Sequence, residues 1–146
     1  MSEKEPRASF SAHPGSEPAS PPSLHITLGQ FFARAEAGTL TGIRCTRCGA
    51  LAVPPKEFCG ACHHRAWEPV PLSGEGRITS FTVIRVAPRG YAADAPYAIA
   101  HVTLTEGVAL LGRLVDIPLE QIAIGMPVRF RPLAQNGHTV LGFGPA

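Results

Sequence analysis

The spacing of large apolar side chains changes along the chain and divides it into parts. Residues 1–23 are rich in proline, serine and charge, and Phe10 is their only large apolar side chain apart from the initiator methionine. A segment of this composition buries too little apolar surface to offset the conformational entropy that folding removes. We therefore expect residues 1–23 to form a disordered tail.

An amphipathic helix is predicted within residues 24–39. Four apolar side chains recur there at steps of three and four, as on one helical face: Leu28, Phe31, Phe32 and Ala35. Ser23 or Thr27 is placed to cap the start of the helix, and Gly38 is typical of its end. We expect the apolar stripe to pack on the same molecule. The alternative is that Phe31 and Phe32 contact a partner protein.

The apolar period becomes two after residue 76, and β-branched residues become frequent, as in half-buried strands. This pattern predicts five strands, at residues 77–86, 97–105, 108–115, 128–131 and 139–143. Glu106-Gly107 is a hairpin signal between the second and third strands, and Asn136-Gly137 is one between the last two. Residues 118–122 are expected to form a helical turn, and the proline- and glycine-rich residues 67–76 a connector.

The predicted fold is mainly β with an N-terminal helix. Five short strands with a small helical turn between the third and fourth match the partly open barrel called the OB-fold. A small sandwich or another five-stranded barrel is the alternative, because the order of strands does not establish closure. The expected organisation is a tail at 1–23, a helix at 24–39, a metal-binding ribbon at 40–72 and an OB-fold at 73–146.

The chemistry of the ribbon rests on cysteines. All four cysteines lie in two Cys-x-x-Cys pairs, Cys45 with Cys48 and Cys59 with Cys62. Two such turns brought together supply the four thiolates that structural Zn2+ accepts in tetrahedral geometry. Iron or two disulfides would use the same residues, but disulfides belong to oxidising compartments, and the chain begins without a secretory signal segment. Four protein ligands close the coordination shell, so we expect the metal to stabilise the fold without taking part in catalysis.

Charged and imidazole side chains surround these cysteines. The basic residues flanking them are Arg44, Arg47, Lys56 and Arg65. They are placed to offset the surplus negative charge of four thiolates around one Zn2+. His63 and His64 follow the last cysteine, and we expect them to be solvated because four sulfurs already complete the site.

The order of these parts resembles a known family, the small proteins with an N-terminal helix, a rubredoxin-like zinc ribbon and a C-terminal OB-fold that accompany thiolase-like enzymes. The resemblance covers the chain from Leu24 to its end. The motifs that carry it are Gly38-Thr39-Leu40, Cys45-Thr46-Arg47-Cys48-Gly49, Pro54-Pro55, Cys59-Gly60-Ala61-Cys62, Gly74-Glu75-Gly76, Ser80-Phe81-Thr82, Ala95-Pro96-Tyr97, Glu106-Gly107 and Ile124-Gly125-Met126-Pro127-Val128. Gly60 stands where the family often has proline, and this departure should not affect metal ligation.

The resemblance implies a non-catalytic accessory subunit of a hetero-oligomeric complex. Relatives of this kind accompany thiolases with hydroxymethylglutaryl-coenzyme A synthase, sterol side-chain aldolases of thiolase fold, or acyltransferases in lipid or steroid metabolism. The catalytic residues are then expected on the thiolase-like partner. The family's OB-fold is thought to touch coenzyme A or to shape the entrance to the partner's acyl-CoA site.

The loop at residues 87–96 is the candidate ligand-binding segment, because the connection after the first OB-fold strand commonly lines the ligand face. Arg89, helped by Arg85, is expected to meet a coenzyme A phosphate while Tyr91 or Phe81 stacks on the adenine. A solvated loop is the alternative. A single strand histidine, His101, is the best catalytic candidate, but the sequence places no second catalytic group beside it.

Charge and hydropathy limit the choice of partners. The formal net charge is only +2 over 146 residues, which gives little reason to expect a polyanion as partner. Single-stranded nucleic-acid binding is nevertheless the alternative function, because zinc ribbons and OB-folds both serve it. No apolar run approaches the roughly 20 residues that cross a bilayer, so we expect a cytoplasmic protein with no membrane contact.

Overall fold

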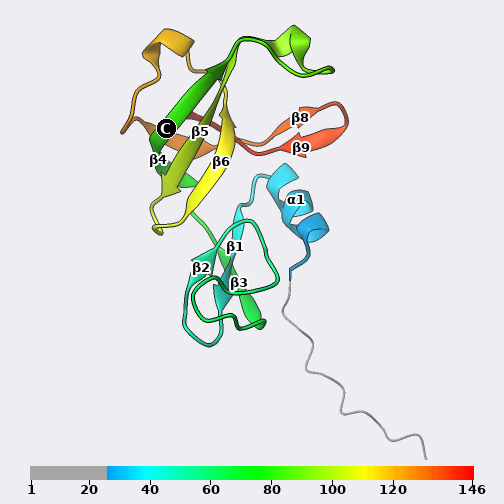
Figure 1. The fold of residues 1–146 in the computed structure, drawn as a ribbon, viewed down its shortest axis with the longest axis vertical. Coiled ribbons are helices and arrows are strands. Elements are labelled where there is room, and N and C mark those ends of the chain that lie inside the picture. The colour runs from blue at the N-terminus through cyan, green and yellow to red at the C-terminus, as the bar shows by residue number, and fades with distance from the viewer. Residues whose placement is uncertain (1–25) are drawn as a thin grey trace, which may run out of the picture.

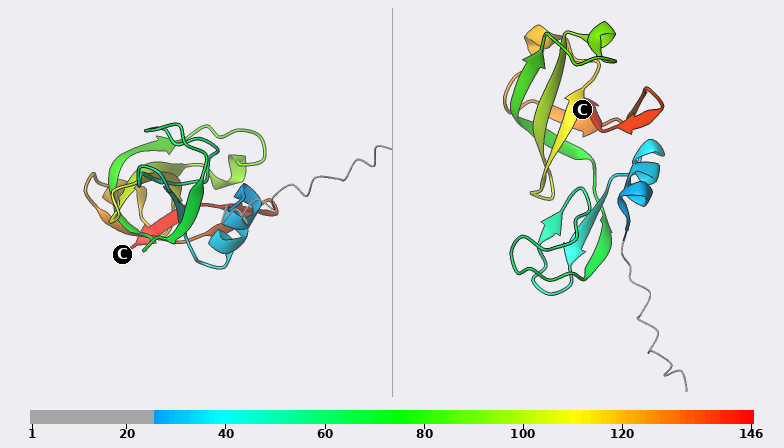
Figure 2. Two further views of the ribbon diagram at one scale, coloured as in Figure 1. Left: turned by 90° about the horizontal axis from the view of Figure 1, so that it is seen from below. Right: turned by 45° about the vertical axis from the view of Figure 1, so that its right-hand side comes forward.

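The computed structural model describes residues 26–146, so the predicted tail at residues 1–23 lies outside the described residues (Figure 1). A helix, a three-stranded sheet and a five-stranded barrel with an attached hairpin follow one another along the chain. Figure 2 shows the three-stranded sheet at one end of the molecule, the barrel at the other, and the helix beside the hairpin. No helix within residues 26–146 has the length and apolar character needed to cross a membrane.

Helix α1 (Leu28–Glu36) begins at a capping box. The Thr27 hydroxyl accepts a hydrogen bond from the backbone N–H of Gln30 (3.1 Å), and the Gln30 side-chain oxygen accepts one from the N–H of Thr27 (2.9 Å). These two bonds satisfy N–H groups that the first helical turn leaves without partners. Gly38 follows the helix with a φ of +90°, a conformation that favours glycine. Thr27 and Gly38 therefore act as the sequence predicted.

The ribbon is a three-stranded antiparallel sheet. Strand β1 (Thr41–Cys45) lies between β2 (Leu51–Ala52) and β3 (Trp67–Pro71). The expectation of a connector over residues 67–76 was wrong for its first half, because residues 67–71 pair with all of β1. The two prolines of β3 are tolerated because β3 is an edge strand, whose outer side needs no hydrogen-bond donors.

The barrel confirms the OB-fold prediction. Its strands are β4 (Glu75–Ile84), β5 (Tyr97–Leu104), β6 (Ala109–Leu114), β7 (Pro127–Phe130) and β10 (Gly142–Pro145). They close in the order β10-β6-β5-β4-β7, and all neighbours are antiparallel except β6 and β10. The helical turn η2 (Leu119–Gln121) lies between the third and fourth barrel strands, as predicted. A second short turn, η1 (Ala92–Asp94), lies in the loop between β4 and β5.

The last part of the chain differs from the prediction. Residues 128–131 and 139–143 were expected to pair around Asn136-Gly137, but that turn joins β8 (Leu133–Gln135) to β9 (His138–Val140). These two strands form a separate hairpin outside the barrel. Of the second predicted strand, only Gly142 and Phe143 belong to β10, which pairs with β7 so that Phe143 lies opposite Phe130. The turn signal was correct, whereas the strand beyond it is two strands with different partners.

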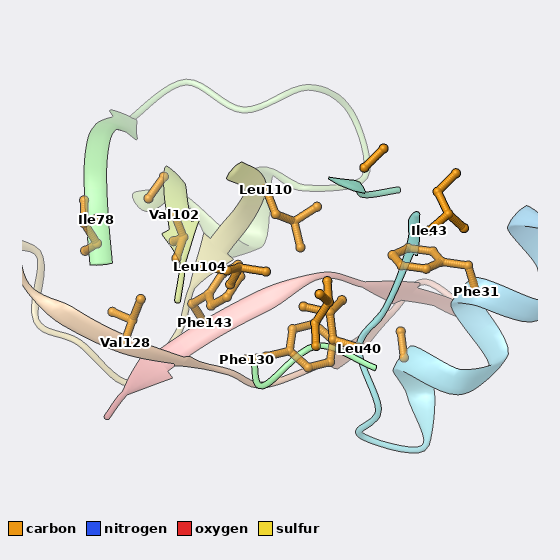
Figure 3. Close-up of a cluster of buried hydrophobic side chains, with 14 of the residues drawn as sticks. Phe31, Leu40, Ile43, Ile78, Val102, Leu104, Leu110, Val128, Phe130 and Phe143 are labelled. Atoms are coloured by element: carbon orange, nitrogen blue, oxygen red, sulfur yellow. The ribbon is translucent and has the colours of Figure 1, made fainter. Parts of the chain in front are cut away.

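The core runs continuously from the ribbon through α1 into the barrel (Figure 3). Phe31 and Ala35 of the predicted helical stripe are fully buried, because α1 contacts both β1 and β9. The other two residues of the stripe face outward, with Leu28 53% and Phe32 37% exposed. Inside the barrel, Phe143 is fully buried and stacks edge-on against Phe130 at 5.9 Å.

Candidate functional site

The four cysteines meet in one cluster. Their sulfur atoms all lie within 4.8 Å of one another, with 3.6 Å between Cys45 and Cys62 and 3.5 Å between Cys48 and Cys59. A tetrahedral zinc with sulfurs at about 2.3 Å requires sulfur–sulfur separations of about 3.8 Å. A disulfide would need about 2.0 Å, so these are four free thiols arranged to bind one metal ion. The cluster thus fits a closed, structural zinc site.

Two matching turns aim the sulfurs inward. After the first pair, the N–H of Gly49 donates to the carbonyl of Cys45 (2.9 Å), and after the second pair the N–H of His63 donates to that of Cys59 (2.9 Å). Both Gly49 and His63 adopt a positive φ, +76° and +62°. His63 therefore closes a turn in the place that glycine takes in the first pair, and neither it nor His64 belongs to the metal-binding cluster.

The pKa values of the thiols show why the four sulfurs need a bound cation to ionise together. The backbone N–H of Cys62 is the main group that lowers the pKa of Cys59, to about 6, and the N–H of Cys48 lowers that of Cys45. The backbone bond from Ala50 lowers the pKa of Cys48. The neighbouring Cys59 sulfur and burial raise this pKa by more, so that it is about 12. Four sulfurs this close cannot all ionise alone, and a bound divalent cation removes that restriction.

Glu57, two residues before Cys59, contacts two side chains of the ribbon. Its backbone carbonyl accepts a hydrogen bond from the Trp67 indole N–H (3.1 Å), and its carboxylate pairs with Arg65 (2.8 Å). Arg65 also lies over the ring of Phe58 at 4.4 Å. Arg65 is one of the basic residues predicted to offset thiolate charge. In the structure it pairs with the Glu57 carboxylate, and its effect on the thiolates stays a prediction.

A second site is a pocket of about 370 Å³ between α1, the barrel and the β8–β9 hairpin. Its floor is the outer face of β5 and β6, the face that OB-folds commonly use for ligands. Most of the lining is apolar or aromatic: Phe32, Tyr91, Tyr97, Ile99, Leu111, Gly112, Val140 and Leu141, with Arg113, Gln135 and Thr139 as the polar members. Such a pocket suits an apolar group better than a phosphate.

Among the described residues, Arg113 is the one charged side chain that lines this pocket, and its charge is already paired. The guanidinium lies over the Tyr97 ring at 4.4 Å, donates to Gln135 Oε1 (2.9 Å) and is 3.7 Å from Asp94. The Gln135 amide also donates to Asp94, and the Asn136 amide donates to the carbonyl of Gly90 (3.3 Å). These contacts fasten the loop of residues 87–96 to the hairpin and shape one wall of the pocket.

The predicted ligand-binding residues are only partly brought together. Tyr91 lines the pocket, whereas Phe81, Arg85 and Arg89 are exposed and do not. Binding of coenzyme A by these four residues stays a prediction. Sequence reasoning missed Arg113 and its partners, because their only common signal is proximity in the fold.

The two residues predicted to contact a partner, Phe31 and Phe32, lie in different environments. Phe31 is buried inside this chain, and Phe32 is exposed at the mouth of the pocket. Only Phe32 therefore offers surface to a partner in this structure, and partner contact stays a prediction. His101 is exposed on the outer face of β5, and the lining of the pocket does not include it.

Taken together, the closed barrel and the four-thiol cluster define a zinc-ribbon and OB-fold protein. Residues 32–68 match the family described as the ChsH2 rubredoxin-like zinc ribbon domain, and residues 69–131 match the ChsH2 C-terminal OB-fold domain. The chain belongs to this family of DUF35 proteins, as its motifs predicted.

Known relatives agree with this assignment. A DUF35 domain-containing scaffold protein of Methanocaldococcus jannaschii is 38% identical over 101 residues, covering 67% of this chain and 72% of that protein. The benzoylsuccinyl-CoA thiolase subunit BbsA of Thauera aromatica is 30% identical, covering 72% and 74%. A solved structure described as Ltp2-ChsH2(DUF35) aldolase has a TM-score of 0.69 at 32% identity, covering 88% of this chain and 98% of that one.

Proposed function

We propose that this chain is a non-catalytic accessory subunit of a thiolase-like enzyme complex that acts on acyl-coenzyme A substrates. The pocket on the outer face of β5 and β6 carries this proposal, because it joins a common OB-fold ligand face to an apolar lining of a size suited to an acyl group. The relatives named as a scaffold protein and as a CoA thiolase subunit support the accessory role.

The chemistry of the pocket supports a binding role over a catalytic one. Its described lining includes no histidine, cysteine, lysine or carboxylate, so it offers no general base beside a nucleophile. The charge of Arg113 is shared with Asp94 and Gln135. The reacting groups are accordingly assigned to the partner enzyme, and the structural zinc maintains the ribbon against which α1 packs.

The acyl or pantetheine part of the substrate would lie in the pocket, and its phosphates outside it. Arg85 and Arg89 are exposed, and within residues 26–146 neither forms an ion pair. Arg89 is free to meet phosphate oxygens while Tyr91 at the pocket stacks on the adenine. This part of the proposal joins the pocket to the loop at residues 87–96.

Co-purification tests the proposal. The chain is co-expressed with the thiolase-like products of neighbouring genes, and we expect one of them to elute with it as a stable complex.

Coenzyme A is then titrated into the complex by calorimetry, with Arg89→Ala expected to weaken binding. Arg129→Ala is the matched control, because Arg129 forms only an exposed pair with Glu75. Equal affinity of the Arg89→Ala variant would remove this loop from the site, and salt-sensitive binding of a single-stranded oligonucleotide would favour the nucleic-acid function instead.

A further inference from the structure

Strand β4 is paired on both sides only at its beginning. β7 pairs with its first three residues, and the backbone of Ile78 bonds to Gly125 (2.7 Å) and Met126 (3.0 Å). The register of the β4–β5 ladder shifts between Ile78 and Ser80, and the pairing of β4 with β7 ends at Arg77. From Ser80 to Ile84, β5 is the only strand that pairs with β4 in the described chain (Figure 1). The opposite edge of this stretch is open.

The direction of the backbone groups follows from the ladder on the other side of β5. The N–H of Leu104 in β5 donates to Val108 on the β6 side (2.9 Å). Because the backbone direction alternates along a strand, the N–H and C=O groups of Val102, Ala100 and Ala98 point toward β6, as those of Leu104 do. A β4 residue that lies opposite one of these residues directs its own N–H and C=O away from β5. In the open stretch these residues are Phe81 and Val83. Their backbone donors and acceptors are available to a further strand.

The other strand edges among residues 26–146 carry prolines or border another element. In the ribbon, β3 contains two prolines and β2 runs into Pro54-Pro55, and proline on an edge prevents pairing with another chain. β8 is fastened to the loop of residues 87–96, and β9 contacts α1. Leu111 and Gly112, in the part of β6 beyond its pairing with β10, line the same pocket as Phe32. The stretch Ser80–Ile84 contains neither proline nor lysine.

Apolar groups flank this open edge. Phe81 lies on it and is 37% exposed, Val86 beyond its end is 92% exposed, and Ile124 is 62% exposed one residue before the Gly125 that bonds to Ile78. An extended segment along the edge would cover apolar side chains while its backbone satisfies Phe81 and Val83. Both features together are typical of β-augmentation.

The charge around β4 indicates which kind of segment would pair with its open edge. Residues 76–93 contain Arg77, Arg85 and Arg89 and no aspartate or glutamate. A second copy of this chain would bring the same arginine-rich run to the edge and no acid to complement it. We propose that an extended, acidic segment of a partner chain adds to β4 as a strand along Ser80–Ile84, with its acidic end at Arg85. That the donor is the enzyme subunit rests on the proposed function, whereas the edge and its charge preference do not.

Hydrogen exchange with a synthetic peptide tests the edge directly. The probe is an acidic heptapeptide of alternating valine and threonine with a glutamate and an aspartate at its ends, added at millimolar concentration to the isotope-labelled, zinc-loaded chain. We expect the amides of Phe81 and Val83 to exchange at least about tenfold more slowly, since they gain acceptors. An N-methylated form of the peptide should protect neither amide. Absence of protection by the acidic peptide would overturn the proposal.

Two further outcomes test the choice of occupant. A peptide with lysines at both ends should protect less, and equal protection would overturn the acidic preference. Slow exchange of Phe81 and Val83 that depends on protein concentration, without any peptide, would identify a second copy as the occupant and overturn the proposal.

Variants connect the edge to the enzyme subunit. Val83→Pro removes an outward N–H, and Phe81→Lys places a charge on the edge in case the proline variant does not fold. Ala109→Lys is the matched control on an exposed strand position of β6. We expect the two edge variants to bind the co-purifying subunit at least tenfold more weakly than the control does. If the wild-type chain binds no such subunit, the proposed function fails, whereas equal binding by all variants refutes only the edge as the docking site.

Discussion

Replacing Phe31 with alanine should destabilise this protein far more than the same change at Phe32, although the two residues are adjacent. Phe31 is fully buried where α1 meets the ribbon, and removing a buried phenylalanine side chain typically costs about 3–5 kcal/mol through lost burial and the cavity left behind. Phe32 is 37% exposed, so its truncation should cost only about 1–2 kcal/mol. For a domain of this size the Phe31→Ala change corresponds to a loss of roughly 10–20 °C in Tm.

Urea denaturation at fixed zinc concentration measures this difference. Trp67 is the only tryptophan of the chain and lies buried in the ribbon, so its fluorescence reports the unfolding of the region that Phe31 stabilises. Phe32→Ala serves as the matched variant, because it removes the same side chain from the same helix. Equal losses of free energy of unfolding for the two variants would refute the assignment of Phe31 to the interior and Phe32 to the surface.

Four further outcomes are expected. Cys59→Ser should abolish stoichiometric zinc binding and unfold the ribbon, since a structural zinc contributes on the order of 10 kcal/mol, and metal analysis with circular dichroism checks this. Zinc affinity, measured against a competing chelator, should fall as the pH is lowered, because binding displaces the proton that Cys48 retains with its pKa raised to about 12. The fall should steepen below pH 6, where Cys59 also becomes protonated; a pH-independent affinity would contradict the four-thiolate site. Gly112→Ala should cost about 1–3 kcal/mol, because a Cβ there would lie 2.6 Å from the Phe143 ring, whereas Gly29→Ala on the exposed start of α1 should be neutral or stabilising by up to about 1 kcal/mol in thermal unfolding.

The parts of the fold that sequence reasoning found are those with local signals. The two cysteine pairs, the Thr27 cap and the alternation in residues 77–86 each depend on neighbours within a few positions. Strand β3 was missed because its prolines are typical of connectors, and only its place at the edge of the ribbon makes them acceptable.

The last barrel strand was not predicted correctly, for a related reason. Residues 142–145 contain two glycines and a proline and have little strand propensity, so pairing with β6 and β7 holds them in a strand. The pocket depends on still longer distances. Its walls come from α1, the loop before β5, two barrel strands and the hairpin, and only Phe32 and Tyr91 were singled out in advance. Nothing local joins Arg113 to Asp94 and Gln135, which lie about 20 residues away on either side.

The placement of α1 has a mechanical consequence. One peptide bond separates Phe31, which is anchored against the metal-stabilised ribbon, from Phe32, which forms a wall of the pocket on the barrel. Any loosening of the ribbon must shift that wall, and anything that fills the pocket must in return favour the anchored position of the helix. We therefore expect metal occupancy of the ribbon and ligand occupancy of the pocket to be thermodynamically linked through this turn of the helix.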